Sequence, residues 1–282
     1  MSATTAAAAV EMRLRSLGLS SFATHFAEFA DRAAKDGTSH VEYLGALCEV
    51  ETRQRAERRV ARLLRASGLP RGKTFATLEL ERLPAPARTA LASLRTGGFL
   101  ESTTNVLVFG PPGTGKSHVA SALGHELVER GHSVVYTKTY AIVQRLLAAK
   151  RDLRLPQELR KLDHVECLVL DDVGYVQQDR EEMEVLFTVL AERYERRSVV
   201  ITSNLVFSKW DQIFKNPMTT AAAIDRLVHH AAVLELNVPS YRAEQALARS
   251  SAARRDGRGA TARRTHRERE SVLPPSGRAA EA

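Results

Sequence analysis

The segment from Gly110 to Ser117 has the residue types and spacing of a phosphate-binding loop. Its sequence, GPPGTGKS, fits the pattern G-x-x-x-x-G-K-[ST]. Glycines at these positions let the backbone turn, so that its N–H groups and the start of the next helix point at phosphate oxygens. The sequence therefore predicts a nucleoside triphosphate site. The residues expected to contact the nucleotide are Gly110, Pro111, Pro112, Gly113, Thr114, Gly115, Lys116, Ser117 and His118.

Two side chains of this loop have separate tasks. Lys116 is expected to reach the β- and γ-phosphates, and Ser117 is expected to hold Mg²⁺. The alternative is a glycine-rich turn before an ordinary helix. It is disfavoured because an apolar run at 105–109 predicts a buried strand before the loop, and apolar residues at helical spacing predict a helix over 118–130.

Two adjacent carboxylates, Asp171 and Asp172, follow the apolar run at 167–170. This is the Walker B pattern, in which a buried strand ends at the same sheet edge as the phosphate loop. Asp171 is expected to hold Mg²⁺, directly or through water, beside Ser117. Asp172 is expected to polarise the attacking water. The alternative is that the two aspartates cap the following turn.

The water-activating position has Asp172 where a longer glutamate would reach further. An aspartate is shorter by about one methylene, so either the backbone lies closer or the water is less well aligned. A misplacement of about 1 Å can cost on the order of a hundredfold in rate. We therefore expect a slow or partner-gated ATPase.

Two further polar residues are candidates for the γ-phosphate. Asn204 follows the apolar run at 199–202 and can hydrogen-bond the attacking water or the γ-phosphate, although an asparagine there can also be a turn former. Arg226 has no obvious intramolecular partner, and an arginine supplied to a neighbouring subunit would couple hydrolysis to assembly. An ordinary ion pair is the alternative for Arg226. The consecutive His229 and His230 are expected to point apart and not to form a metal pair.

The composition indicates a globular protein with a basic surface. A chain of 282 residues with 44% hydrophobic content has room for an α/β domain and a smaller one. The net charge of +8 suggests a polyanionic partner such as nucleic acid, although coding bias toward Arg and Ala is an alternative. Cys48 and Cys167 indicate neither a disulfide framework nor a zinc site. No stretch approaches the roughly 18 apolar residues of a membrane span, so we expect no membrane partner and a cytoplasmic location.

The predicted elements divide the chain into four parts. Residues 1–70 lack strand signals and predict a small all-α N-terminal domain that binds DNA or a partner, and 71–102 form a connector with a short helix at 87–95. Residues 103–242 alternate strands and helices, which is typical of a three-layer α/β/α fold with a parallel sheet. Residues 243–282 are basic and expected to be disordered, either as a DNA arm or merely as a soluble end. The predicted strands lie at 105–109, 133–137, 167–170, 199–202 and 232–236, and the predicted helices at 118–130, 140–150, 181–193 and 220–230.

The last predicted helix of the N-terminal domain is rich in arginine. Six arginines lie within thirteen positions: Arg53, Arg55, Arg58, Arg59, Arg62 and Arg65. Such a helix is often only a solvated face. This density exceeds what solubility needs and favours contact with DNA phosphates.

Several stretches together closely resemble the IstB transposition helper ATPases, which are AAA+ proteins related to the DnaC helicase loaders. The resemblance spans about residues 10–242, and the run at 193–204 is far more specific than a phosphate loop. The stretches that carry it are 105–118, 171–175, 193–204, Trp210, 225–230 and 240–242.

The resemblance implies a P-loop AAA+ fold, ATP and Mg²⁺ as cofactors, and a role for each matching residue. Lys116 and Ser117 would bind the nucleotide and metal, and Asp171 and Asp172 would form the Walker B pair. Asn204 would be the sensor. The finger acting in trans would be Arg226.

The resemblance also implies partners for the chain. They are duplex DNA, further copies of the chain in an ATP-dependent homo-oligomer, and a transposase encoded by a neighbouring gene. Three alternatives stay open. The chain could be a DnaC-like replicative helicase loader, a DNA-bending scaffold that uses ATP only for assembly, or, most distantly, a small-molecule kinase.

Overall fold

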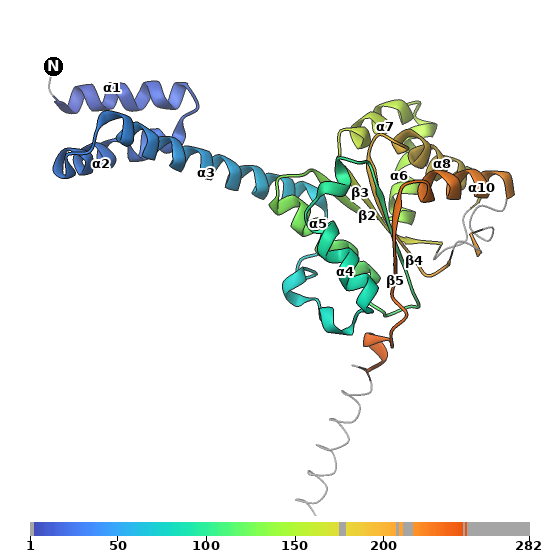
Figure 1. The fold of residues 1–282 in the computed structure, drawn as a ribbon. Coiled ribbons are helices and arrows are strands. Elements are labelled where there is room, and N and C mark those ends of the chain that lie inside the picture. Colours follow the sequence, from blue (N-terminus) through green and yellow to red (C-terminus); the bar gives the residue numbers. More distant parts are fainter. Residues whose placement is uncertain (1–2, 175–178, 207–208, 211–216, 245, 247–282) are drawn as a thin grey trace, which may run out of the picture.

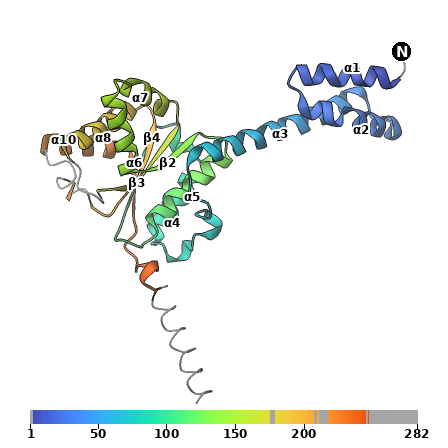
Figure 2. The ribbon, with the colours of Figure 1, turned by 180° about the vertical axis from the view of Figure 1, so that it is seen from behind.

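The computed structural model describes residues 3–174, 179–206, 209–210, 217–244 and 246. An N-terminal helical lobe and an α/β lobe are joined by one long helix, α3 (Figure 1). The N-terminal lobe contains α1 (Ala3–Ser16), α2 (Ser20–Asp36) and the first part of α3 (His40–Ser67). Seen from behind, α3 leaves the helical lobe and ends against the α/β lobe near α5 (Figure 2).

Helix α3 is held at both ends by contacts that its sequence specifies. Ser39 and Glu42 form a capping box at its start, and Gly68, with φ 68°, ends it in the left-handed conformation. Near its middle, the buried Glu51 accepts a hydrogen bond from the Ser21 backbone N–H at 2.9 Å. At its far end, Leu63 packs on the core of the α/β lobe. The helix therefore connects the two lobes physically.

A parallel five-stranded sheet forms the centre of the α/β lobe. Its strand order is β2-β3-β4-β1-β5, and every described pair of neighbouring strands is parallel. The sequence prediction of an α/β fold with a parallel sheet is thus confirmed. The strands are β1 (Asn105–Phe109), β2 (Val134–Lys138), β3 (Cys167–Val173), β4 (Ser198–Ser203) and β5 (Ala231–Glu235).

Alternate side chains of the central strands enter two separate cores, one on each face of the sheet. Leu107, for example, packs with α6, α8 and α10, whereas its neighbour Val106 packs with α4 and α5. This alternation explains why the strands are apolar throughout. The helices are α4 (Ala85–Leu94), α5 (Lys116–Glu129), α6 (Thr139–Arg151), α7 (Leu155–Asp163), α8 (Arg180–Arg193) and α10 (Pro217–Val228).

The predicted connector is well-packed structure. Leu83, Leu91 and Phe99 are buried and belong to the same core as α5. Besides α4, this stretch contains the short 3-10 turns η1 (Phe75–Thr77), η2 (Leu80–Arg82) and η3 (Gly98–Leu100). Residues 71–102 therefore help to build the α/β lobe.

The basic tail lies outside the described residues from 247 onward, and so does Tyr175 of the Walker B stretch. Within the described part of the chain, no helix combines the length and apolar character needed to cross a membrane.

Candidate nucleotide-binding site

The phosphate-binding loop connects β1 to α5, as predicted. Gly113 has φ 84°, a conformation that side chains rarely adopt, and a Cβ atom there would lie 2.1 Å from the Ser240 hydroxyl. At Gly110 a Cβ atom would lie 2.6 Å from the carbonyl oxygen of Leu236. The glycines are therefore needed both for the turn and for the close approach of the C-terminal segment.

Lys116 is buried at the first turn of α5, with 5% of its surface exposed. Its Nζ donates hydrogen bonds of 2.8 Å to the carbonyl oxygens of Gly110 and Pro111. Burial lowers the pKa of its ammonium, and the nearby Asp172 and Asp171 only partly oppose that effect. The loop thus carries a desolvated cation where phosphate groups are expected.

The carboxylate of Asp171 lies at the centre of a hydrogen-bond network. Ser117 donates to its Oδ1 at 2.8 Å, and Thr202 donates to the same oxygen. Tyr136 and Lys138 donate to its Oδ2, the latter at 2.6 Å. Burial acts to raise the pKa of Asp171, but these hydrogen bonds outweigh it and hold the pKa below its usual range.

These residues fit the Mg²⁺ ion that the fold implies. Ser117 and Asp171 supply a hydroxyl and a carboxylate, which are the hard oxygen ligands that Mg²⁺ prefers. A carboxylate has about four acceptor positions, and four donors already contact Asp171. Asp171 therefore suits contact with the metal through water better than direct ligation.

Asp172 departs from regular strand geometry. Its φ is 63°, and the pairing of β3 with β4 shifts between Leu170 and Val173. Aspartate tolerates this left-handed conformation better than most residues, and such a bulge changes the direction of a side chain. The short side chain of Asp172 thus occurs where the backbone departs from the regular path of the strand. Its Oδ2 lies 2.5 Å from the Lys138 Nζ.

A pocket of about 440 Å³ lies beside the loop. Asp172 and Asn204 line it together with the loop residues Pro112 to His118, as the sequence predicted for the sheet edge. Two other segments complete its walls: connector residues within 73–83 and C-terminal residues within 238–242. Neither segment was predicted to belong to the site.

Four further residues of the site were missed. Tyr136 and Lys138 lie two positions apart on β2, so both side chains reach the same face, and Lys138 is the register partner of Asp171. Thr202 is the next-to-last residue of β4, which pairs with β3. Arg242 lines the pocket, and besides burial its charge lowers the pKa of Lys116. A predicted strand order would have revealed the first three.

Arg226 lies elsewhere. Its guanidinium is 4.9 Å from the centre of the Phe187 ring on α8, and its Nη1 is buried without a hydrogen-bond partner. The sequence indicated no obvious intramolecular partner for Arg226, and the structure supplies Phe187 because α10 packs against α8. The described lining of the pocket does not include Arg226.

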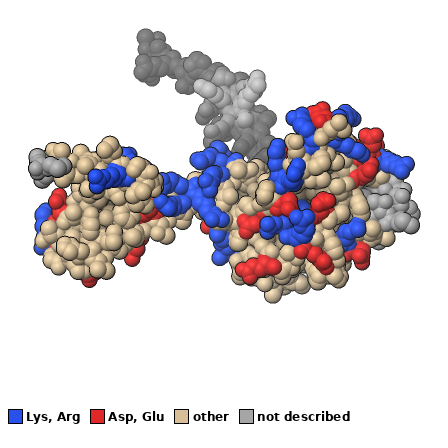
Figure 3. All heavy atoms as spheres, turned by 90° about the horizontal axis from the view of Figure 1, so that it is seen from above, with Lys and Arg blue, Asp and Glu red and all other residues tan. Residues whose placement is uncertain are grey.

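The arginines of α3 differ in what they contact. Arg55 and Arg58 form ion pairs with Glu51, and Arg59 donates to the carbonyl oxygen of Gly131 at 3.0 Å. The others are exposed and form no ion pair with any described residue: Arg53, Arg62 and Arg65. Basic side chains gather along the helix between the two lobes (Figure 3).

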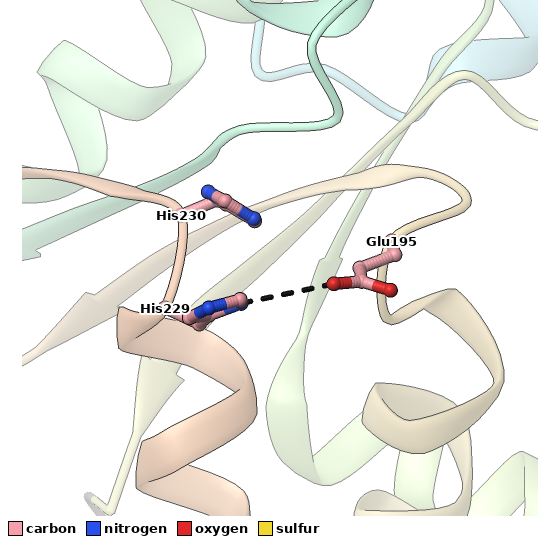
Figure 4. Close-up of side chains that lie close together, drawn as sticks. All are labelled: Glu195, His229 and His230. Carbon is pink, nitrogen blue, oxygen red and sulfur yellow. Dashed lines mark ion pairs between the residues drawn. The ribbon is translucent and has the colours of Figure 1, made fainter.

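Glu195, His229 and His230 form a surface cluster (Figure 4). The histidine rings lie 4.2 Å apart, so the prediction that they point apart is wrong. The reason is that α10 ends at Val228, and helical spacing does not apply to the turn after it. His229 Nδ1 already lies 3.0 Å from the Tyr194 hydroxyl and 3.7 Å from Glu195. Through these contacts the turn after α10 packs against the turn after α8, and this packing explains why the three residues lie together.

Comparison with known proteins gives a consistent assignment. Residues 12–249 match the family model described as IstB-like ATP binding protein. An insertion sequence ATP-binding protein of Sinorhizobium fredii is 41% identical over 235 residues, which are 83% of this chain and 79% of that protein. The ATP-binding protein of insertion sequence IS21 from Pseudomonas aeruginosa is 32% identical over 236 residues, which are 84% and 89% of the two chains.

Solved structures agree on the fold. The crystal structure of DnaI has a TM-score of 0.51 and 18% identity, and the match covers 61% of this chain and 96% of that one. Domain III of the Thermotoga maritima replication initiation protein DnaA has a TM-score of 0.51 and 19% identity, with 65% and 74% covered. At these identities the likeness shows the shared fold alone.

Proposed function

Because this chain belongs to the family of IstB-like ATP-binding proteins, we propose that it is an ATPase that assembles on duplex DNA in its ATP-bound state and assists transposition. One observation carries the enzymatic part. The phosphate loop, the Ser117–Asp171 pair, Asp172 and Asn204 all meet at one edge of the parallel sheet. This is the edge where open α/β sheets bind their ligands.

In this mechanism the loop backbone and Lys116 hold the triphosphate. Lys116 gives up its hydrogen bonds to Gly110 and Pro111 and turns to the phosphate oxygens. Ser117 and Asp171 would hold Mg²⁺, and the ion, when bound, would neutralise charge on the β- and γ-phosphates. Arg242 adds a second cation at the pocket wall.

Asp172 and Asn204 orient the attacking water. Asp172 accepts a proton or hydrogen bond from the water, and the Asn204 amide donates to the water or the γ-phosphate. The ammonium of Lys138 competes with the attacking water for Asp172, because its Nζ already lies 2.5 Å from Asp172 Oδ2. This contact gives a physical reason for slow hydrolysis by the isolated chain.

The second half of the site comes from a neighbouring copy. Arg226 is not among the described residues that line the pocket of its own chain, so we assign it to the γ-phosphate of another subunit. Such a finger accelerates hydrolysis by about 10³ to 10⁵ in other P-loop enzymes. Hydrolysis then depends on a homo-oligomer.

DNA binding is assigned to α3. At about 100° per residue, Arg55, Arg58, Arg59, Arg62 and Arg65 fall within an arc of roughly 120° on one helix face. Phosphate contacts from this face bind duplex DNA with little sequence preference and strong salt dependence. The partner for transposition is a transposase encoded by a neighbouring gene.

Phosphate release from ATP, measured with and without duplex DNA, tests the proposed enzyme. We expect slow release by the protein alone and faster release with duplex. Release at the level of a Lys116→Ala variant in both conditions would leave a non-hydrolysing scaffold as the better account. Fast release without duplex or partners would contradict the gating.

A further inference from the structure

The mouth of the nucleotide pocket is bridged by side chains from segments far apart in the sequence. Arg82, at the end of η2, forms an ion pair with Glu244. The same guanidinium lies 5.0 Å from the centre of the Tyr241 ring. Arg82 and Tyr241 both line the pocket, one on the connector wall and the other on the C-terminal wall. We call Arg82, Tyr241 and Glu244 the latch.

Each wall is separately attached to the phosphate-binding region. On the C-terminal side, the Tyr241 backbone N–H donates to the carbonyl oxygen of Gly113 at 3.0 Å. On the connector side, His118 Nε2 lies 3.1 Å from both Thr77 Oγ1 and the carbonyl oxygen of Thr74. The latch is therefore the contact that closes a ring of attachments around the pocket.

We propose that the latch retains bound nucleotide and that Arg82 is a positioning residue that sets the rate of nucleotide release. A nucleotide that leaves through the mouth requires the two walls to separate there. Separation breaks the ion pair with Glu244 and the contact of the guanidinium with the Tyr241 ring. Both contacts are partly exposed, so each contributes modestly, and together they slow release about three- to tenfold.

The latch acts apart from the chemical step. Asp172 and Asn204 line the pocket from β3 and β4, whereas Arg82 and Glu244 come from the connector and the segment after β5. Loss of the latch is therefore expected to raise the release rate of ADP and of ATP alike.

The test measures the release of a fluorescent ADP from the full chain after mixing with excess unlabelled ADP. The variants are Arg82→Ala, Glu244→Gln and the double variant, with Tyr241→Leu as an independent probe of the ring contact. Arg88→Ala is the matched control. It breaks the Arg88–Glu81 ion pair on the same connector, and Arg88 is not among the described residues that line the pocket.

We expect Arg82→Ala and Glu244→Gln each to release ADP about three- to tenfold faster. The double variant should release no faster than Arg82→Ala, and Arg88→Ala should match the parent chain. Parent-like release by Glu244→Gln would overturn the latch, even with fast release by Arg82→Ala, since Arg82 would then act on the nucleotide directly. The two proposals can be told apart. If only the latch proposal is wrong, the chain still binds ADP. If the proposed ATPase site is wrong, the chain does not bind ADP.

Discussion

Lys138 lies between the two carboxylates that end β3. Its Nζ is 2.6 Å from Asp171 and 2.5 Å from Asp172, and 40% of its side chain is exposed. Burial acts to lower the pKa of Lys138, but its hydrogen bonds to both aspartates raise the pKa overall. It therefore stays charged and, in the proposed mechanism, competes with water for Asp172.

Replacing Lys138 with methionine tests this role. Lys138→Met frees Asp172 Oδ2, so we expect basal phosphate release to rise by a few-fold while the melting temperature of the nucleotide-free protein falls, because two adjacent carboxylates lose their counter-ion. Both are measured on the purified chain. Lys150→Met is the control, since its ion pair with Glu184 is exposed. Lower phosphate release by Lys138→Met would show that Lys138 assists hydrolysis.

Arg193, the first residue of the run at 193–204, connects three elements of the α/β lobe. It is 2% exposed, and its guanidinium donates to four carbonyl oxygens, those of Leu162, Val165, Glu166 and Ser198. Burial lowers its pKa to about 10. A single side chain thus connects the end of α7 to the starts of β3 and β4. The run at 193–204 then supplies β4 and Asn204.

Arg193→Met should destabilise the α/β lobe by about 2–4 kcal/mol, because buried carbonyl groups lose their donors. Chemical unfolding followed by circular dichroism measures the change. Arg197→Met is the control, because Arg197 is exposed and, among the described residues, its side chain donates only to the carbonyl oxygen of Asp163. Equal stability of the two variants would show that the hydrogen bonds of Arg193 do not stabilise the lobe.

Among the elements, the packing of α3 on α2 contributes stability that depends on pH. Burial acts to raise the pKa of Glu51, but hydrogen bonds from Arg55 and Ser21 outweigh it and lower the pKa from 4.5 to about 2. A carboxyl with a lowered pKa in the folded state stabilises it fully above its unfolded pKa. This contribution is therefore present above about pH 4.5 and lost as the pH falls toward 2.

Glu51→Gln should loosen the packing of α2 on α3 at neutral pH and remove this part of the acid dependence. Thermal unfolding followed by circular dichroism between pH 7 and pH 3 measures both effects. Glu49→Gln is a control at an exposed position of the same helix. A parallel loss of stability with falling pH in Glu51→Gln and the parent chain would assign the acid dependence to other groups.

Most helices and strands were predicted from the sequence, and the structure shows the physical reasons. The apolar runs at 105–109, 167–170 and 199–202 became the buried centre of the sheet. Helix α7 was missed because it is short and largely polar, and only Leu162 is buried. The bounds of the other elements differ by a few residues.

The candidate site was predictable only where a local pattern carries it. The phosphate loop and the two aspartates are contiguous motifs, so spacing was enough to find them. Lys138 and Arg82 belong to the site because strand order and the return of the C-terminal segment bring them there. Such contacts depend on tertiary structure, which no local spacing reveals. The roles of Asn204 and Arg226 stay predictions.

At the scale of the whole molecule, the exposed arginines of α3 give the clearest test of DNA binding. Arg58 and Arg59 already contact Glu51 and Gly131, so a change there also disturbs the fold. Arg62 and Arg65 are exposed. Arg62→Glu with Arg65→Glu should weaken duplex binding and reduce the salt slope by about two.

Fluorescence anisotropy with labelled duplex across salt concentrations measures both quantities. Arg53→Glu is the matched control, because helical spacing puts Arg53 on the opposite face of α3. An equal loss of binding in the control would indicate a general effect of charge. An unchanged salt slope in the double variant would remove this helix face from the interface.

Imaging of the purified protein tests whether ATP drives assembly of this chain on duplex DNA. The protein is mixed with duplex DNA and a non-hydrolysable ATP analogue, and particles are compared with those of Lys116→Ala and of the protein without nucleotide. We expect multi-subunit particles on DNA only for the parent chain with nucleotide. Single chains in every condition, or equal assembly by Lys116→Ala, would contradict the account.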